Sequence, residues 1–169
     1  MRLVVKLIDS ITDYVGRAAC LLAIVLIMVL AGETVLRYGF GKPTMWGYEL
    51  SYMVGASMAV FAWSYTHFRK GHVRVDLIYS RLSIRARAVI DVVCSLIFLA
   101  PLLYVLVLAG YNSVGFAIRM REVLTMSSWM PPAWPIRTIV FIGFTLFCLQ
   151  CIAQFVRDVY ALVWNRTYD

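Results

Sequence analysis

Four long apolar runs are the sequence feature that most restricts how this chain can fold. They cover residues 15–36, 46–68, 92–118 and 138–156. Each run has about the 20 mostly apolar residues that a helix needs to cross a bilayer. Hydrophobic residues make up 62% of the chain and charged residues only 15%, against about 25% charged residues in an ordinary soluble domain. The sequence therefore predicts an all-α integral membrane protein, with four transmembrane helices in a single domain (residues 1–169), and excludes a soluble enzyme and a disordered tail.

The basic residues predict the orientation of these helices. Eleven of the 16 Lys and Arg residues lie in the N-terminal stretch, in the loop between the second and third runs, or in the C-terminal tail. Because basic loops stay on the cytoplasmic side, both termini are expected in the cytoplasm. Val29 and Ala31 have the spacing of a signal-peptide cleavage site, but the long leading region with Asp9 and Asp13 argues against cleavage.

The stretch before the first run has the periodicity of an amphipathic helix. Apolar residues recur at helical spacing between residues 3 and 15, and Asp13 and Arg17 are placed to pair on the opposite face. This pattern predicts a helix that lies on the lipid headgroups. The alternative is a simple flank of the first span, with charged side chains that extend to the headgroups.

A second amphipathic stretch covers residues 75–90, for which the same alternative stands. Asp76 is a candidate N-cap. Three basic residues on this stretch are expected to bind anionic lipid headgroups, namely Arg81, Arg85 and Arg87.

Glu33 is an acid within the first apolar run, and such a residue is a candidate functional group. Arg37 follows four residues later on the same helical face, where an ion pair offsets much of the cost of burial. Lys42 and Glu49 are expected at the same membrane level, so the four residues are predicted to form one polar cluster at the outer end of the first helical hairpin. A structural or partner-contact role is favoured. The alternative is a stand-alone proton-coupled exporter that uses Glu33.

His and Cys residues raise the question of a metal or haem site. His67 and His72 lie near one end of a single span, which is a poor arrangement for axial haem ligands from facing helices. Cys148 and Cys151 share one face of the fourth span, where their geometry is poor for a disulfide, so apolar packing is expected. The sequence predicts no metal, no cofactor and no enzymatic activity in this chain. The alternative is a cytochrome-like redox anchor.

Small residues form a continuous stripe along the second span, at Gly47, Ser51, Gly55 and Ala59. Small side chains let another helix approach closely in lipid, so this stripe is predicted to pack against a partner helix. A contact within the chain is the alternative. Pro101 is expected to kink the third span.

The outer loop before the fourth span is rich in Pro, Trp and charged residues. Its tryptophans suit an aromatic belt at the membrane interface, whereas its rigidity and charge favour a docking surface for a partner. The candidate docking residues of this loop are Arg119, Arg121, Glu122, Trp129 and Trp134.

Three segments carry a resemblance to a known family. They are RYGFGKPTMWGYEL at residues 37–50, GHVRVDL at residues 71–77, and PPAWP before a last span that contains Gly143 and Gln150. In order and spacing they resemble the small membrane subunit, of the DctQ type, of tripartite ATP-independent periplasmic (TRAP) transporters. The residues that match the pattern of the family are Arg37, Pro43, Trp46, Glu49, His72 and Asp76.

This resemblance implies a scaffold that depends on partners. A large membrane subunit would hold the substrate and sodium sites and move as an elevator, and a periplasmic binding protein would deliver the substrate, usually an organic acid. The small subunit would support the large one in the bacterial or archaeal inner membrane and help to dock the binding protein.

Overall fold

The computed structural model describes residues 2–69 and 83–164 of the chain, and almost all of these residues are helical. The elements are α1 (Arg2–Thr34), η1 (Val35–Gly39), α2 (Gly47–Phe68), α4 (Ile84–Cys94), η2 (Ser95–Leu99), α5 (Ala100–Arg119) and α6 (Trp134–Trp164). Within these two ranges there is no β-strand, only an isolated antiparallel bridge between Val123 and Pro132. The predicted all-α membrane architecture is confirmed.

Three helical segments in the described ranges are long and apolar enough to cross a membrane: Leu3–Gly39, Arg85–Arg119 and Trp134–Trp164. The second predicted span forms α2, which has 22 residues but carries more polar side chains. Two of them, Ser57 and Ser64, are buried within the chain. The count of four membrane spans therefore stays a prediction.

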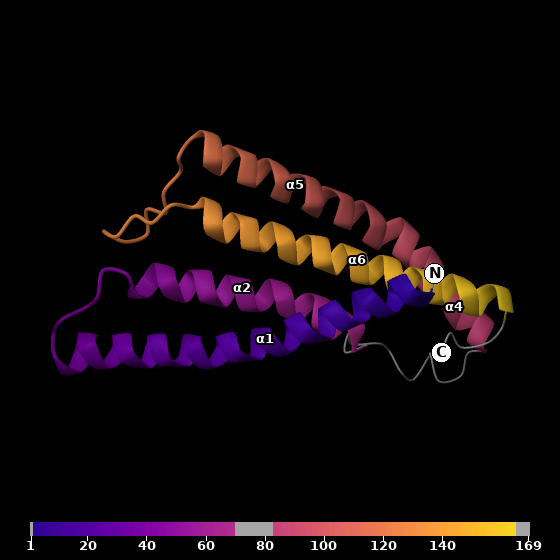
Figure 1. Cartoon of the computed structure of the whole chain (residues 1–169), viewed down its shortest axis with the longest axis horizontal. Coiled ribbons are helices and arrows are strands. Elements are labelled where there is room, and N and C mark those ends of the chain that lie inside the picture. Colours follow the sequence, from indigo (N-terminus) through magenta and orange to yellow (C-terminus); the bar gives the residue numbers. More distant parts are fainter. Residues whose placement is uncertain (1, 70–82, 165–169) are drawn as a thin grey trace.

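The helices lie side by side in a row, in the order α1, α2, α6, α5 (Figure 1). Each helix of the row contacts the next one, and α6 also contacts α4 and α1. In the most apolar 18-residue stretch of each helix, 6% of the residues are buried within the chain for α1, against 28% for α6. Most apolar side chains of α1 and α5 therefore face outward, as expected where lipid or another protein surrounds them.

The amphipathic N-terminal stretch is continuous with the first span instead of forming a separate helix. It makes up the first half of α1, which runs unbroken for 33 residues. No proline interrupts the segment, and its first glycine, Gly16, stays helical. Similarly, α4 begins at Ile84, where the Ser83 hydroxyl accepts a hydrogen bond from the Ala86 amide, and continues into the third span. The proposed Asp76 cap lies outside the described residues.

Two π-helical turns interrupt the long helices. One of them, η2, ends two residues before Pro101. Proline has no amide hydrogen, and its ring would clash with the carbonyl group four residues earlier in a regular α-helix. A wider turn relieves both problems, so the disturbance expected from Pro101 takes the form of a π-turn. The other turn, η1, ends the first span and carries Arg37.

Glycine permits two close contacts between helices. The Gly16 backbone of α1 lies against the ring of Tyr65 from α2, and Gly143 of α6 lies against Val60 of α2. A Cβ atom on Gly143 would come within 2.5 Å of Val60 Cγ1 and 2.8 Å of Val60 Cβ. Because the second atom cannot move without the backbone, α2 and α6 would have to separate.

The variant Gly143→Ala is therefore expected to lower the free energy of unfolding by about 1–3 kcal/mol, as other overpacked cores do. Thermal unfolding of the purified protein in detergent measures the loss. Gly115→Ala on α5 is the matched control, because a Cβ at Gly115 meets no atom within 4 Å. Equal unfolding temperatures for the two variants would contradict this packing.

Candidate functional site

Polar side chains gather at the two opposite ends of the helical row. The loop end contains the connections at residues 40–46 and 120–133, and the N-terminal end contains residues 2–17 of α1 (Figure 1). Between the ends, residues 18–32, 50–68, 92–118 and 138–156 contain no Asp, Glu, Lys or Arg. The charged side chains are therefore concentrated at the two ends of the row.

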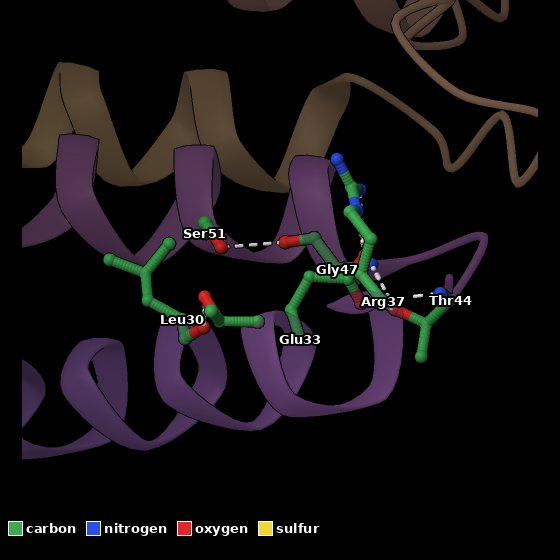
Figure 2. Close-up of polar contacts among 7 residues, drawn as sticks. Leu30, Glu33, Arg37, Thr44, Gly47 and Ser51 are labelled. Atoms are coloured by element: carbon green, nitrogen blue, oxygen red, sulfur yellow. Dashed lines mark hydrogen bonds and ion pairs between the residues drawn. The ribbon is translucent and has the colours of Figure 1, made fainter. Parts of the chain in front are cut away.

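At the loop end, Glu33 holds the α1–α2 connection in place (Figure 2). Its Oε1 accepts hydrogen bonds from Arg37 Nε at 3.1 Å and Arg37 Nη2 at 2.7 Å. Its Oε2 accepts from the Thr44 amide at 3.2 Å and from the Thr44 hydroxyl. The same hydroxyl accepts from the Gly47 amide at 3.1 Å, which satisfies the first turn of α2. The predicted Glu33–Arg37 pair is present, and both carboxylate oxygens are engaged.

Glu49 takes part in a separate arrangement. Its side chain is fully buried, and it accepts hydrogen bonds from the Ser127 amide at 2.8 Å and from the Ser127 hydroxyl. Ser127 Oγ in turn accepts from the Trp129 amide at 3.2 Å. Glu49 also lies in the first turn of α2, where the helix dipole favours a negative charge. One carboxylate of α2 thus fixes the tip of the outer loop.

The base of the outer loop is fixed by Arg137 of α6. Its guanidinium donates to Ser113 Oγ at 2.9 Å and pairs with Glu122. At the end of α5, the Glu122 amide donates to the Ala117 carbonyl at 3.0 Å. Arg121 adopts a left-handed conformation with φ of 49°. This is the Schellman arrangement, with arginine at the position that glycine usually takes.

Three of the four residues predicted to form one cluster are therefore divided between two arrangements. Glu33 and Arg37 bind the α1–α2 connection, whereas Glu49 binds the outer loop. Lys42 is exposed. Its backbone amide donates a hydrogen bond to the Leu36 carbonyl. Glu49 and Ser127 are 78 residues apart, so no local spacing rule indicated their contact.

The small-residue stripe packs at least partly inside the chain. Gly47 approaches Glu33 of α1, and Gly55 lies opposite Leu26 of α1. Ser51 donates a hydrogen bond to the Gly47 carbonyl of its own helix at 2.6 Å. Ala59 is half-buried on the same helix, and the contact of this stripe with a partner helix stays a prediction.

The remaining candidates at the loop end are exposed. The tip of the outer loop presents three large side chains to the outside, those of Met126, Trp129 and Met130. The other exposed residues from the sequence-based candidates are Pro43, Trp46, Arg119, Arg121 and Trp134. Glu122 is half-buried because it pairs with Arg137.

At the N-terminal end, sequence reasoning missed a network that joins α1 to α6. The Gln150 side chain is fully buried; its Oε1 accepts from the Thr12 hydroxyl at 3.0 Å, and its Nε2 donates to Asp9 at 3.1 Å. Asp9 also pairs with Arg157. The position of Gln150 within an uncharged apolar run was the available signal, because a buried amide requires partners.

Asp13 joins α1 to α2 at the same end. Its carboxylate pairs with Arg17 at 2.5 Å and with Arg69 at 3.1 Å. The Tyr65 hydroxyl accepts a hydrogen bond from Arg69 Nε at 3.2 Å. This bond, with the nearby Asp13 charge, raises the pKa of Arg69 above its ordinary value.

Three of the candidate residues, Arg81, His72 and Asp76, lie outside the described residues. Arg85 is exposed on α4, and Arg87 is half-buried. The His67 ring packs edge-on against Phe147 of α6 at 5.6 Å. Across residues 2–69 and 83–164, no group of three or more His, Cys, Asp or Glu side chains is placed to hold a metal ion.

Comparison with protein families agrees with this architecture. A family model described as the DctQ component of tripartite ATP-independent periplasmic transporters matches residues 24–161. A search of curated protein sequences gives no match. The matched range contains the last third of α1, all of α2, α4 and α5, both connections at the loop end, and most of α6. The chain therefore belongs to the DctQ family and is a small membrane component of a tripartite ATP-independent periplasmic transporter.

Proposed function

We propose that the chain is the scaffold subunit of a sodium-coupled, binding-protein-dependent importer of organic acids. In this proposal it supports a large elevator-type membrane subunit, which holds the sodium and substrate sites, and helps to dock the periplasmic binding protein. It lies in the inner membrane with both termini in the cytoplasm. Membership of the DctQ family is the observation that carries the proposal.

The polar contacts support a scaffold over a transporter that works alone. Glu33, Glu49 and Asp9 each bind other parts of the same chain. Transporter substrate sites are typically built from polar groups and broken helices near the middle of the membrane. Here the four central segments carry no Asp, Glu, Lys or Arg. The carboxylates therefore connect helices and loops.

Two surfaces suit the proposed partners. The outward side of α1 is apolar, with Leu21, Ile24 and Ile27 more than half exposed, and this side would contact the large subunit. The outer loop, whose tip is fixed by Glu49, would contact the binding protein. Arg85 and Arg87 would hold anionic headgroups at the other end.

Coexpression with the neighbouring genes tests the proposal. A larger membrane protein is expected to copurify with the chain, and liposomes are expected to take up an organic acid only when both membrane proteins and the binding protein are present. Uptake should require a sodium gradient. Transport by the chain alone, or by its partners without it, would contradict the scaffold role.

Glu33→Gln separates this proposal from a stand-alone exporter. An exporter that carries protons on Glu33 would lose all transport in this variant, because the amide cannot release a proton. In the scaffold, the amide oxygen still accepts one hydrogen bond, so uptake by the assembled system is expected to stay within about threefold of the wild type, which corresponds to the loss of a partly exposed contact. Uptake of radiolabelled substrate measures the difference.

A further inference from the structure

A groove of about 550 Å³ lies between α1 and α2 at the loop end. Its inner part is lined by Leu26 and Leu30, and its outer part, toward the α1–α2 connection, is polar and lined by Glu33 and Arg37. Residues 26 to 37 advance about 16 Å along a helix axis. The groove thus combines an apolar and a polar part over a length that suits one acyl chain below one headgroup.

Arg37 has hydrogen-bonding capacity that the chain does not use. Its Nε and Nη2 atoms donate to Glu33, but no described residue accepts a hydrogen bond from its Nη1. About half of the side chain is exposed, at 48%. Guanidinium groups bind phosphate oxygens through several N–H donors. The Nη1 atom is therefore available to a phosphate at the outer part of the groove.

The charge of Arg37 is compensated within the groove by Glu33, whose side chain is only 12% exposed. An anionic headgroup with no positive group would gain little from such a neutral pair. Three exposed tyrosines, Tyr38, Tyr48 and Tyr52, complete the lining. Aromatic faces attract ammonium groups at partly desolvated sites. The charge distribution favours a ligand that carries both a phosphate and an amine.

We propose that this groove binds one zwitterionic phospholipid, such as phosphatidylethanolamine. The phosphate accepts hydrogen bonds from Arg37 Nη1, the ammonium group lies among the tyrosine rings, and one acyl chain follows Leu26 and Leu30. The site is distinct from the basic residues of α4, which would attract anionic lipids at the other end of the row. It requires only that the chain lies in a membrane, and so it is independent of the proposed transport function.

Native mass spectrometry of the full chain in detergent tests the proposal with three added lipids: phosphatidylethanolamine, phosphatidylglycerol and diacylglycerol. One phosphatidylethanolamine molecule is expected to bind with clear preference over the other two. Arg37→Gln is expected to weaken its binding about tenfold, the effect of losing a charge-assisted hydrogen bond. Equal or tighter binding of phosphatidylglycerol, or equal binding of diacylglycerol, would overturn the proposal.

A second variant keeps the test valid if Arg37→Gln disturbs the fold. Leu30→Trp would fill the apolar part of the groove and leave the ion pair intact, and it is also expected to weaken binding about tenfold. Leu21→Trp on the same helix is the matched control, because Leu21 is exposed but does not line the groove. Equal binding by both tryptophan variants, or loss of the lipid from the complex copurified with a larger membrane protein, would also overturn the proposal.

Discussion

Replacing Asp9 by arginine is expected to lower the free energy of unfolding by about 3–5 kcal/mol, the cost of breaking a largely buried ion pair. The side chains of Asp9 and Arg157 are each only 19% exposed. In the variant, two guanidinium groups would face each other, and Gln150 would lose the acceptor of its amide hydrogen. Because this network joins α1 to α6, thermal unfolding in detergent should begin at a clearly lower temperature.

The exchanged pair Asp9→Arg with Arg157→Asp is expected to recover about half of this loss, since it restores the ion pair but not the bond from Gln150. Arg17→Ala is the control for an exposed pair. Arg17 is 72% exposed, and its removal is expected to cost less than about 1 kcal/mol. If the exchanged pair is no more stable than Asp9→Arg alone, the attraction between the two charges is not what holds α1 against α6.

Replacing Glu49 by leucine is expected to release the tip of the outer loop. The Ser127 amide would lose its acceptor in a partly buried position, which costs about 1–3 kcal/mol. Local opening of the loop should then become roughly tenfold more frequent. Limited trypsin digestion measures this opening through cleavage after the exposed residues Arg119 and Arg121.

Lys42→Ala is the matched control, because it also changes one charge at the loop end but leaves the contact with Ser127 in place. Its cleavage rate after Arg119 and Arg121 is expected to equal that of the wild type. In the assembled transporter, Glu49→Leu should also weaken binding of the periplasmic protein if the outer loop is its docking surface. An unchanged cleavage rate in Glu49→Leu would show that other contacts fix the loop.

The sequence predicted the features that depend on neighbouring residues. The helical class followed from the apolar runs, and the Glu33–Arg37 pair followed from a spacing of four residues on one helix face. Likewise, Pro101 indicated a disturbance in the third span, which the structure contains as a π-turn that ends two residues before it. In each case the physical cause acts within one or two helical turns.

Contacts between distant segments could not be predicted in this way. Gln150 and Thr12 are 138 residues apart, and their contact depends on α1 lying against α6. The position of α1 depends in turn on Gly16, which allows Tyr65 to approach its backbone. The separate amphipathic helix was expected because charge and periodicity describe the surface of a segment, whereas continuity with the next segment depends on the absence of a helix breaker.

The arrangement of the helices in a row has a consequence for the order of assembly. A row of helices has two broad sides. Each helix contacts its neighbours within the row, and the polar contacts lie at the loop end and the N-terminal end, so neither broad side is needed to hold the helices together. Another membrane protein can therefore cover one broad side while lipid still covers the other, and no helix of the row needs to move. In the proposed assembly, the chain would insert and fold first, and the larger subunit would then replace lipid along the side on which α1 is exposed.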